Sequence, residues 1–419
     1  MKLMWVCNMK PGEIQKALTG KEGSANWLDH VLADLAGSGN KLHVLCRGGE
    51  EQGSLDENRS FACFRDRKPY QYLPEVEAFF QGQMASYKPD VIHIWGTEYA
   101  HTFAAVNAAE KLGLLDRVVI SIQGLCSVCA LHYAEGVPQH ILRRYTFRDL
   151  LRRDNIRDQI RAFARRGYYE VEALKKVRHV IGRTEWDRAC VYGVNPGARY
   201  HFCNETLRHP FYEGGWDYAA CTPHRIFASS CVYPVKGFHY LLHALAELKK
   251  EYPDATLAVT GKSFLDLSFM DKLHRGGYHK YLAQLVAEYH LEDSIEFLGK
   301  LSPEGMKEQY LKANVFALPS TIENSPNSLG EAMLLGTPCV AADVGGVTTL
   351  MRHESEGYVY QSTAPYMLAH YIRCLWESSD KASEMGQAAR LHARQTHAPD
   401  KNIQDLLRIY TEVASCIDK

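Results

Sequence analysis

Short apolar runs alternate with longer segments of helical periodicity along the first part of this 419-residue chain. We expect strands at 42–46, 91–95, 118–122 and 180–183, after a first strand near the N-terminus and with helices such as 27–36 between them. Apolar runs of this length, separated by amphipathic segments, are typical of strands that helices cover on both faces. The alternation therefore predicts parallel βαβ units in an α/β domain.

The same alternation begins again in the second part of the chain. Residues 212–223 show no clear periodicity and hold two adjacent glycines, which predicts a linker. Further strands are expected at 225–229, 255–260, 295–298, 315–318 and 338–342. With roughly 150 residues per domain, we predict two domains, 1–211 and 212–395. Residues 396–419 carry an apolar stripe at helical spacing, and we expect them to form a helix that crosses back onto the first domain.

Composition and charge exclude several classes of protein. Hydrophobic residues make up 46% of the chain, as in an ordinary folded protein. The formal net charge is −1, so the chain lacks the overall positive charge of a nucleic-acid-binding protein. No run approaches the ~20 apolar residues of a membrane-spanning helix, and the N-terminal apolar run is too brief for a signal peptide. We therefore expect a cytoplasmic enzyme. The twelve cysteines are scattered apart from Cys126 and Cys129, which indicates reduced thiols and no metal site.

Two glutamates, Glu323 and Glu331, are separated by seven residues directly after an expected strand. We expect Glu323 in a loop and a helix that begins near 325–327, with Ser325 and Asn327 as caps and Pro326 in the first turn. Ser325, Asn327 and Ser328 are candidates for binding the donor. The unpaired N–H groups of a helix N-terminus bind a diphosphate well. Glu331 can accept two hydrogen bonds from a ribose diol, while Glu323 accepts from sugar hydroxyls. The alternative is that both glutamates are ordinary solvated residues.

This stretch, with the following 332–338 and Gly345-Gly346, closely resembles the signature of retaining family 4 glycosyltransferases of the GT-B fold. A second stretch, 229–237, resembles the loop of that family that binds the donor phosphates and ends in Lys236-Gly237. The resemblance implies that Lys236 stabilises the negative charge growing on the departing phosphate. Ser230 stands where many members of the family have an arginine.

The resemblance implies two Rossmann-like domains that face each other across a cleft. In the first domain it implies that the loop holding Gly23, Ser24 and Asn26 approaches donor phosphate and acceptor. Arg183 is a candidate for the missing phosphate contact, or else a structural ion-pair partner. Residues 198–208 lie near the hinge, where relatives carry an Asn-Gly pair, and this segment adds Asn204 and Glu205 to the donor-side candidates.

Polar residues at strand ends of the first domain are candidates for the acceptor side. His93 lies within one strand, Trp95 ends it and Glu98 follows it. Gln123 stands where the family often has a histidine, so it is limited to hydrogen bonding with the reacting sugar. His93 either serves the reacting sugar or is a packed strand-end histidine.

The resemblance implies a retaining transfer without a covalent protein nucleophile, and it is closer to bacterial polysaccharide-building members than to starch or sucrose enzymes. We expect a UDP-sugar donor and a glycan or lipid-linked glycan acceptor in bacterial surface polysaccharide synthesis. The chain has no Asp-x-Asp pair of the kind that holds a metal-bound diphosphate. We therefore expect no metal and no cofactor, with the helix N-terminus and Lys236 in place of a metal.

Residues 141–167 hold the strongest local charge, nine arginines against three aspartates, with apolar residues interleaved. An amphipathic basic helix of this kind suits an anionic membrane surface that carries a lipid-linked acceptor. The protein would then be peripheral at the inner face of the cell membrane. The alternative is a solvated helix face with internal Arg–Asp pairs.

Two other functions fit the same pattern. A nucleotide-sugar epimerase of this fold binds the same donor but needs a group that abstracts a proton from the sugar. A catalytically silent subunit that binds nucleotide sugar is the other alternative, and Ser230 and Gln123 favour it. The sequence contains no recognisable nucleic-acid-binding module, which argues against a nucleic-acid role.

Overall fold

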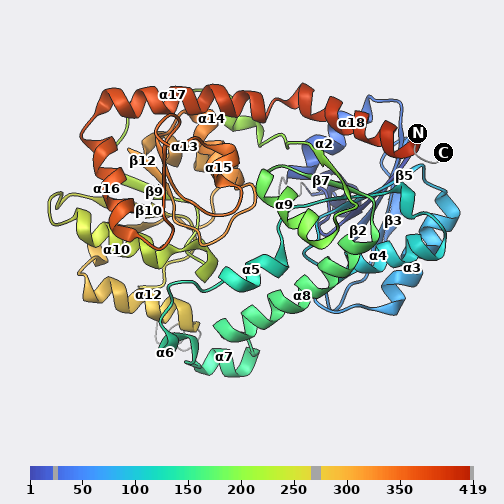
Figure 1. Cartoon of the computed structure of the whole chain (residues 1–419), viewed down its shortest axis with the longest axis horizontal. Coiled ribbons are helices and arrows are strands. Elements are labelled where there is room, and N and C mark those ends of the chain that lie inside the picture. The colour runs from blue at the N-terminus through green and yellow to red at the C-terminus, as the bar shows by residue number, and fades with distance from the viewer. Residues whose placement is uncertain (22–26, 266–274, 416–419) are drawn as a thin grey trace. The chain divides into compact units, whose positions relative to one another are not determined.

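The computed structural model describes residues 1–21, 27–265 and 275–415, which divide into two compact units. Unit 1 consists of Met1–Ala130, Ala162–Thr206 and His397–Lys419, and unit 2 consists of Leu131–Arg161 and Leu207–Thr396. Figure 1 shows the helices and strands of both units. None of the described helices is long and apolar enough to span a membrane.

Unit 1 is built on an eight-stranded sheet, as far as the described residues show, in the order β3-β4-β2-β1-β5-β6-β7-β8. All neighbouring pairs are parallel except β3 with β4. The strands are β1 (Lys2–Cys7), β2 (Lys41–Arg47), β3 (Gln52–Ser54), β4 (Arg59–Phe64), β5 (Val91–Trp95), β6 (Val118–Ser121), β7 (His179–Gly182) and β8 (Arg199–Phe202). The predicted strands at 42–46, 91–95, 118–122 and 180–183 are thus confirmed as β2, β5, β6 and β7.

Helices cover both faces of this sheet, because successive side chains of each strand point to opposite faces. Met4 and Val6 belong to one apolar cluster, and Leu3, Trp5 and Cys7 to another. The helices of this unit are α1 (Gly12–Thr19), α2 (Trp27–Ala36), α3 (Pro74–Tyr87), α4 (Ala100–Lys111), α9 (Glu185–Val194) and α18 (Pro399–Ser415). Two more, α5 (Cys126–His132) and α8 (Ile156–Lys176), run from one unit into the other.

The C-terminal helix α18 packs on the sheet of unit 1, beside α2, as Figure 1 shows. Its buried residues include Ile409, Tyr410 and Val413, which lie in the same apolar cluster as Trp5. The Nε1 of Trp5 donates a hydrogen bond of 3.0 Å to the hydroxyl of Tyr410. The apolar stripe read from the sequence is therefore the buried face of this helix.

Unit 2 holds a parallel sheet whose described strands follow the order β11-β10-β9-β12-β13-β14. The strands are β9 (Arg225–Ala228), β10 (Thr256–Val259), β11 (Ile295–Phe297), β12 (Val315–Leu318), β13 (Cys339–Ala342) and β14 (Tyr358–Tyr360). The helices are α6 (Gln139–Leu142), α7 (Phe147–Arg152), α10 (Phe238–Leu248), α12 (Gly277–Glu288), α13 (Pro303–Lys312), α14 (Asn327–Leu335), α15 (Val347–Leu350), α16 (Pro365–Trp376) and α17 (Ser379–Thr396). The second predicted series of strands is confirmed.

The strand orders of both units reverse direction once. In unit 2 the strands β10 and β11 extend to one side of β9, while β12, β13 and β14 extend to the other. In unit 1 the same reversal falls between β1 and β5. This is the doubly wound arrangement, in which ligands bind outside the carboxyl ends of the strands at the point of reversal.

The division of the chain differs from the boundaries read off the sequence. The chain enters unit 2 at Leu207, and residues 212–223 pack on that unit. Trp216 shows this, since its backbone N–H donates to the Leu335 carbonyl and its Nε1 to the Ala313 carbonyl, both at 2.7 Å. Residues 131–161 also belong to unit 2, where the Oγ1 of Thr321 donates to the His132 carbonyl at 2.7 Å.

Candidate functional site

Two loops of unit 2 meet at the point where its strand order reverses. One follows β9 and ends in the 3₁₀ turn Pro234–Lys236, and the other follows β12. The backbone N–H of Thr321 donates to the Val235 carbonyl at 2.9 Å and joins the two loops. Gly237 has φ +63°, and a Cβ at this position would collide with the Pro319 carbonyl. Only glycine combines this backbone conformation with so close an approach.

Lys236 and Glu323 face each other from these two loops. The Nζ of Lys236 lies 2.6 Å from the Oε1 of Glu323, and the Oγ of Ser320 donates to the same oxygen at 2.7 Å. The Lys236 side chain is half-buried, whereas only 12% of the Glu323 side chain is exposed. Glu323 is therefore not a solvated loop residue, and a defined pair of opposite charges stands at the carboxyl end of the sheet.

The backbone of Glu323 is held by the adjacent glycines that follow β13. The N–H of Gly346 donates to the Glu323 carbonyl at 3.1 Å. Gly345 has φ +52°, and a Cβ there would collide with that same carbonyl. The Gly345-Gly346 pair of the sequence motif thus serves the position of Glu323.

Helix α14 begins at Asn327, and the prediction that Ser325 or Asn327 caps it is wrong. Pro326 occupies the N-cap position, where no side chain accepts a hydrogen bond from the first turn. The Pro326 carbonyl accepts from the N–H of Gly330 at 3.2 Å, so Asn327 already lies inside the helix. Ser325, Asn327 and Ser328 are half-buried there. A helix N-terminus without a side-chain cap keeps backbone donors for an anion.

Glu331 lies one turn further along α14 and is almost completely buried, with 4% of its side chain exposed. The Nε and Nη2 of Arg208 donate to its Oε1 at 2.8 and 2.6 Å. The hydroxyl of Tyr310 on α13 lies 3.3 Å from Oε2. Burial raises the pKa of Glu331 and Arg208 opposes this rise. Glu331 is therefore not an ordinary surface residue.

One further candidate for the donor site lies in unit 2, and three from the first domain lie outside the described residues. Ser230 lies in the loop after β9, where its Oγ accepts from the Val232 N–H at 3.3 Å. Gly23, Ser24 and Asn26 lie outside the described residues. Two contributors were missed from the sequence: Ser320 and Tyr310 have no motif of their own, and only the fold brings them to the two glutamates.

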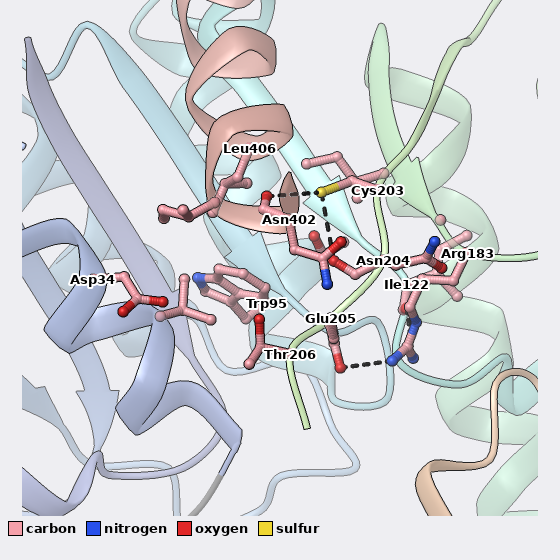
Figure 2. Close-up of a pocket in the computed structure, with 15 residues that line it drawn as sticks. Asp34, Trp95, Ile122, Arg183, Cys203, Asn204, Glu205, Thr206, Asn402 and Leu406 are labelled. Atoms are coloured by element: carbon pink, nitrogen blue, oxygen red, sulfur yellow. Dashed lines mark hydrogen bonds and ion pairs between the residues drawn. The ribbon is translucent and has the colours of Figure 1, made fainter. Parts of the chain in front are cut away.

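Unit 1 has a pocket outside the carboxyl ends of β5 to β8 (Figure 2). Trp95, Asn204 and Glu205 line it, together with Asn402 of α18. The Nη1 of Arg183 lies 2.6 Å from the Oε2 of Glu205, and Figure 2 shows this pair at the edge of the pocket. Both side chains are buried. Arg183 thus has the ion-pair partner that the second of its two interpretations expects, and its contact with a phosphate stays a prediction.

Gln123 belongs to the same network. Its Nε2 donates to the Oε1 of Glu205 at 2.5 Å, and its Oε1 accepts from the Nη2 of Arg183 at 3.3 Å. A carboxylate that accepts from both a guanidinium and an amide is held in one orientation. The network fixes the Gln123 amide at the carboxyl end of β6.

His93 is a packed core residue. Its Nδ1 lies 2.6 Å from the Tyr410 hydroxyl and its Nε2 lies 2.7 Å from the Ser121 Oγ. Burial lowers its pKa well below the ordinary value, so the ring is neutral. With both ring nitrogens engaged, His93 has the geometry of a packed strand-end histidine, and we do not assign it a role at the reacting sugar.

Glu98 follows β5 and carries a shielded carboxyl group. Its Oε2 has no hydrogen-bond partner among the described residues. Burial raises the pKa of Glu98 to about 7, and the nearby carboxylate of Glu170 adds to the rise. Glu170 itself is buried and accepts from the N–H groups of Cys126 and Ser127 at 2.9 and 3.0 Å. Glu98 therefore changes its protonation state near neutral pH, as groups at functional sites often do.

One group of potential metal ligands occurs among the described residues, away from these loops. It consists of His179, His201 and Glu412. The Nδ1 of His179 lies 3.0 Å from the Nε2 of His201, and burial lowers the pKa of both rings to about 4. The Nε of Arg199 already pairs with the Glu412 carboxylate. This pairing neutralises the one anionic ligand of the group.

The basic segment 141–167 is not one helix. It consists of α6, α7 and the first part of α8. Arg153 ends α7 with φ +52°, and the Oδ1 of Asn155 then accepts from the Asp158 N–H at 2.8 Å at the start of α8. The break arises because a residue in the left-handed conformation ends a helix and a cap begins the next.

The sequence of unit 2 is similar to those of known glycosyltransferases. Residues 222–392, which lie within unit 2, match the family model described as glycosyl transferases group 1. A D-inositol 3-phosphate glycosyltransferase of Salinispora tropica is 27% identical over 190 residues, 44% of this chain and 37% of the relative. A putative glycosyltransferase of Bacillus subtilis is 30% identical over 162 residues, 38% of each chain. The chain thus spans less than half the length of these curated relatives.

Similarity to solved structures extends over almost the whole chain. Sucrose-phosphate synthase from Thermosynechococcus elongatus superposes with a TM-score of 0.72 at 17% identity, covering 99% of this chain and 100% of that one. HepE of Anabaena in complex with UDP has a TM-score of 0.64 at 18% identity, covering 98% and 100%. These are GT-B glycosyltransferases, and the predicted GT-B fold of two Rossmann-like domains is confirmed.

Proposed function

We propose that this chain, with its GT-B fold and its match to group 1 glycosyltransferases, is a retaining glycosyltransferase. It moves a sugar from a UDP-sugar to a glycan or lipid-linked glycan acceptor in bacterial surface polysaccharide synthesis. The observation that carries the proposal is the pairing of Lys236 with Glu323, at 2.6 Å, beside the uncapped N-terminus of α14. HepE, which shares the fold, has been solved with UDP and with UDP-glucose, and this supports a uridine nucleotide.

The donor diphosphate binds between Lys236 and the N-terminus of α14. As the bond between the anomeric carbon and the phosphate oxygen breaks, negative charge grows on that oxygen and the ammonium group stabilises it. The first-turn N–H groups of Asn327 and Ser328 and the loop with Ser230 contact the phosphates. Glu323 accepts hydrogen bonds from the hydroxyls of the transferred sugar, and Glu331 from the ribose.

The acceptor hydroxyl attacks the anomeric carbon from the face that the diphosphate leaves. The new glycosidic bond replaces the bond to phosphate, and the hydroxyl proton passes to the departing diphosphate. No covalent protein nucleophile, metal or cofactor is required, because Lys236 and the helix N-terminus neutralise the phosphates. Glu98, Trp95 and Gln123 in unit 1 bind the acceptor side, with Glu98 able to donate or accept a hydrogen bond near neutral pH.

An anionic membrane surface is the proposed partner of helix α7 and its flanks, which would make the protein peripheral at the inner face of the cell membrane. Four large apolar side chains are exposed there: Tyr145 (51%), Phe147 (60%), Leu150 (66%) and Leu151 (67%). Four exposed arginines that form no ion pair with a described residue accompany them: Arg143, Arg144, Arg152 and Arg153. Exposed apolar and cationic side chains together suit a lipid headgroup region.

The same segment argues against a merely solvated helix face. Among its described residues, internal ion pairs join Arg148 to Asp154 at 2.7 Å and to Asp149 at 3.4 Å, and Arg161 to Asp158 at 3.2 Å. The carboxylate of Asp149 also accepts a hydrogen bond in the capping box that it forms with Thr146. The acidic side chains are thus engaged, while the arginines beside the apolar residues stay uncompensated.

A binding and turnover experiment tests the proposed function. Purified protein is titrated calorimetrically with UDP-, GDP- and ADP-sugars, and donor consumption is followed with and without glycan acceptors. We expect one nucleotide sugar to bind and to be consumed only with acceptor. An epimerised nucleotide sugar that forms without acceptor would establish the epimerase instead. Binding without turnover under any acceptor, together with polymer loss in a deletion strain, would favour a silent subunit, and no binding at all would refute the proposal.

A further inference from the structure

Arg208 has no part in the group 1 match, which begins at residue 222, yet it makes the strongest contacts to Glu331. Its Nε and Nη2 both donate to the same carboxylate oxygen, Oε1. Among the described residues, the other oxygen, Oε2, has only the Tyr310 hydroxyl within hydrogen-bond distance, at 3.3 Å. That hydroxyl makes its shorter hydrogen bond, 3.0 Å, to the Ser328 carbonyl. Because a phenol has one proton, Oε2 keeps spare acceptor capacity.

The position of the Arg208 guanidinium is defined by its surroundings. Its Cζ lies 5.0 Å above the ring of Phe211, which is completely buried. The Leu207 N–H donates to the Tyr212 hydroxyl at 3.0 Å and holds the backbone next to Arg208. Arg208 keeps 27% of its side chain exposed, whereas Glu331 keeps 4%. A planar guanidinium stacked on a ring can donate two hydrogen bonds in one plane, which a lysine cannot do.

We propose that Arg208 is the positioning residue that presents Glu331 to the ribose of the donor nucleotide, and that the pair sets the preference for ribose over 2′-deoxyribose. Arg208 occupies Oε1 and leaves Oε2 for the ribose hydroxyls. A diol that meets an oriented, ionised carboxylate gains strong hydrogen bonds, and a sugar lacking one hydroxyl loses one of them. This inference rests on the proposed function, since it assigns a role at the same donor site.

Arg208 also governs the charge of Glu331. Burial raises the pKa of Glu331, whereas the guanidinium lowers it through charge and hydrogen bonding. Without the arginine, the carboxyl group takes up a proton at a higher pH and ceases to be a full acceptor. Loss of Arg208 therefore weakens ribose binding most at low pH and least at high pH.

Other charged or titratable groups around Glu331 are few among the described residues. Tyr310 of α13 contacts it directly, Glu304 of the same helix interacts with Arg208, and Cys339 of β13 interacts with Tyr310. His209 in the turn after Arg208 is exposed and pairs with Glu213. Arg390 of α17 donates instead to the Gly214 carbonyl. Arg208 is the cation that contacts Glu331.

The test compares calorimetric affinities for UDP and 2′-deoxy-UDP between pH 6.5 and 8.5. The variants are Arg208→Gln and Arg208→Lys, with Arg352→Ala as a control at an exposed arginine that pairs with Glu356. The ratio of variant to wild-type affinity at each pH cancels the titration of the UDP phosphate, whose pKa is about 6. Circular dichroism checks that each variant is folded. If Arg208→Gln does not fold, Arg208→Lys still tests the inference.

We expect Arg208→Gln to weaken UDP binding about tenfold at pH 6.5, the order of one lost hydrogen bond to a charged group, and less at pH 8.5. It should also reduce the preference for UDP over 2′-deoxy-UDP. Arg208→Lys should keep the wild-type pH profile with part of the preference lost, and Arg352→Ala should match wild type. Unchanged or tighter UDP binding by folded Arg208→Gln would overturn the inference alone. Failure of the wild-type protein to bind UDP would overturn the proposed donor site with it.

Discussion

The Nζ of Lys236 lies 2.6 Å from the Oε1 of Glu323, although 87 residues separate them along the chain. The two residues follow different strands: Lys236 comes after β9 and Glu323 after β12. These strands are neighbours because the sheet order reverses at β9. The pair therefore depends on the topology of the sheet, and the reversal puts it where doubly wound sheets bind ligands.

Lys236→Met should abolish most of the sugar transfer while the protein stays folded. The variant loses the cation that stabilises the departing phosphate, and the loss of one such group costs about 100-fold or more in kcat. Steady-state kinetics with the donor identified by calorimetry measures the effect. Lys250→Met is the matched control, because Lys250 is exposed and its one ion pair with a described residue is to Glu247. A kcat within about twofold of wild type for Lys236→Met would exclude the assigned role.

Gly237→Ala should destabilise unit 2 more than Gly299→Ala does. Both glycines have nearly the same φ, +63° and +66°, so both variants suffer about 1–2 kcal/mol of left-handed strain. Only at Gly237 does the new Cβ also collide with the Pro319 carbonyl, whereas the space around Gly299 is open. The collision should add roughly 1–3 kcal/mol. Urea unfolding followed by fluorescence measures both, and equal midpoints would show that the two loops are not in close contact.

Glu98→Gln should alter how stability depends on pH. Burial raises the pKa of Glu98 from 4.5 to about 7 in the folded protein. A carboxyl group whose folded pKa is raised contributes stability that is complete below its unfolded pKa and is lost as pH rises through about 7. Wild type should therefore lose more stability than Glu98→Gln between pH 5 and pH 8. Urea midpoints across this range measure the difference, with Glu75→Gln at an exposed carboxyl as control. Parallel pH profiles of wild type and Glu98→Gln would contradict the burial of Glu98.

Vesicle binding should depend on helix α7 and its flanks. At about 1 kcal/mol per arginine near an anionic surface, Arg152→Glu with Arg153→Glu should weaken binding to phosphatidylglycerol vesicles at low salt by about thirtyfold or more. Leu150→Ser with Leu151→Ser should weaken it as well, since both leucines lose apolar contact with the bilayer. Flotation with labelled vesicles gives the bound fraction, with phosphatidylcholine vesicles as the uncharged comparison.

Leu391→Ser is the matched control for the apolar variants, because Leu391 on α17 is 67% exposed, like Leu151. It should leave vesicle binding unchanged. If wild-type protein ignores phosphatidylglycerol vesicles at low salt, the membrane partner is wrong and the exposed apolar side chains need another explanation.

The amino-acid sequence by itself determined most elements of this protein and the region of its candidate donor site. Apolar runs such as 42–46 and 315–318 became strands because their burial on both faces is a local property of composition and length. Glu323, Glu331 and Lys236 were recognisable because their motifs lie within single loop and helix segments. The start of α14 near 325–327 was predicted correctly, but its caps were not, since the choice between Ser325, Pro326 and Asn327 as N-cap depends on a single backbone conformation.

Only the tertiary structure decided the partners of these residues. His93 contacts Tyr410 across 317 residues, Glu331 contacts Arg208 across 123, and neither pairing leaves a trace in local sequence. Each arises because strand order and helix packing bring distant segments together, and burial then obliges a polar group to find a partner. His93 and Glu98 differ in this respect. The His93 ring is hydrogen-bonded within the core, whereas the shielded Oε2 of Glu98 has no hydrogen-bond partner among the described residues.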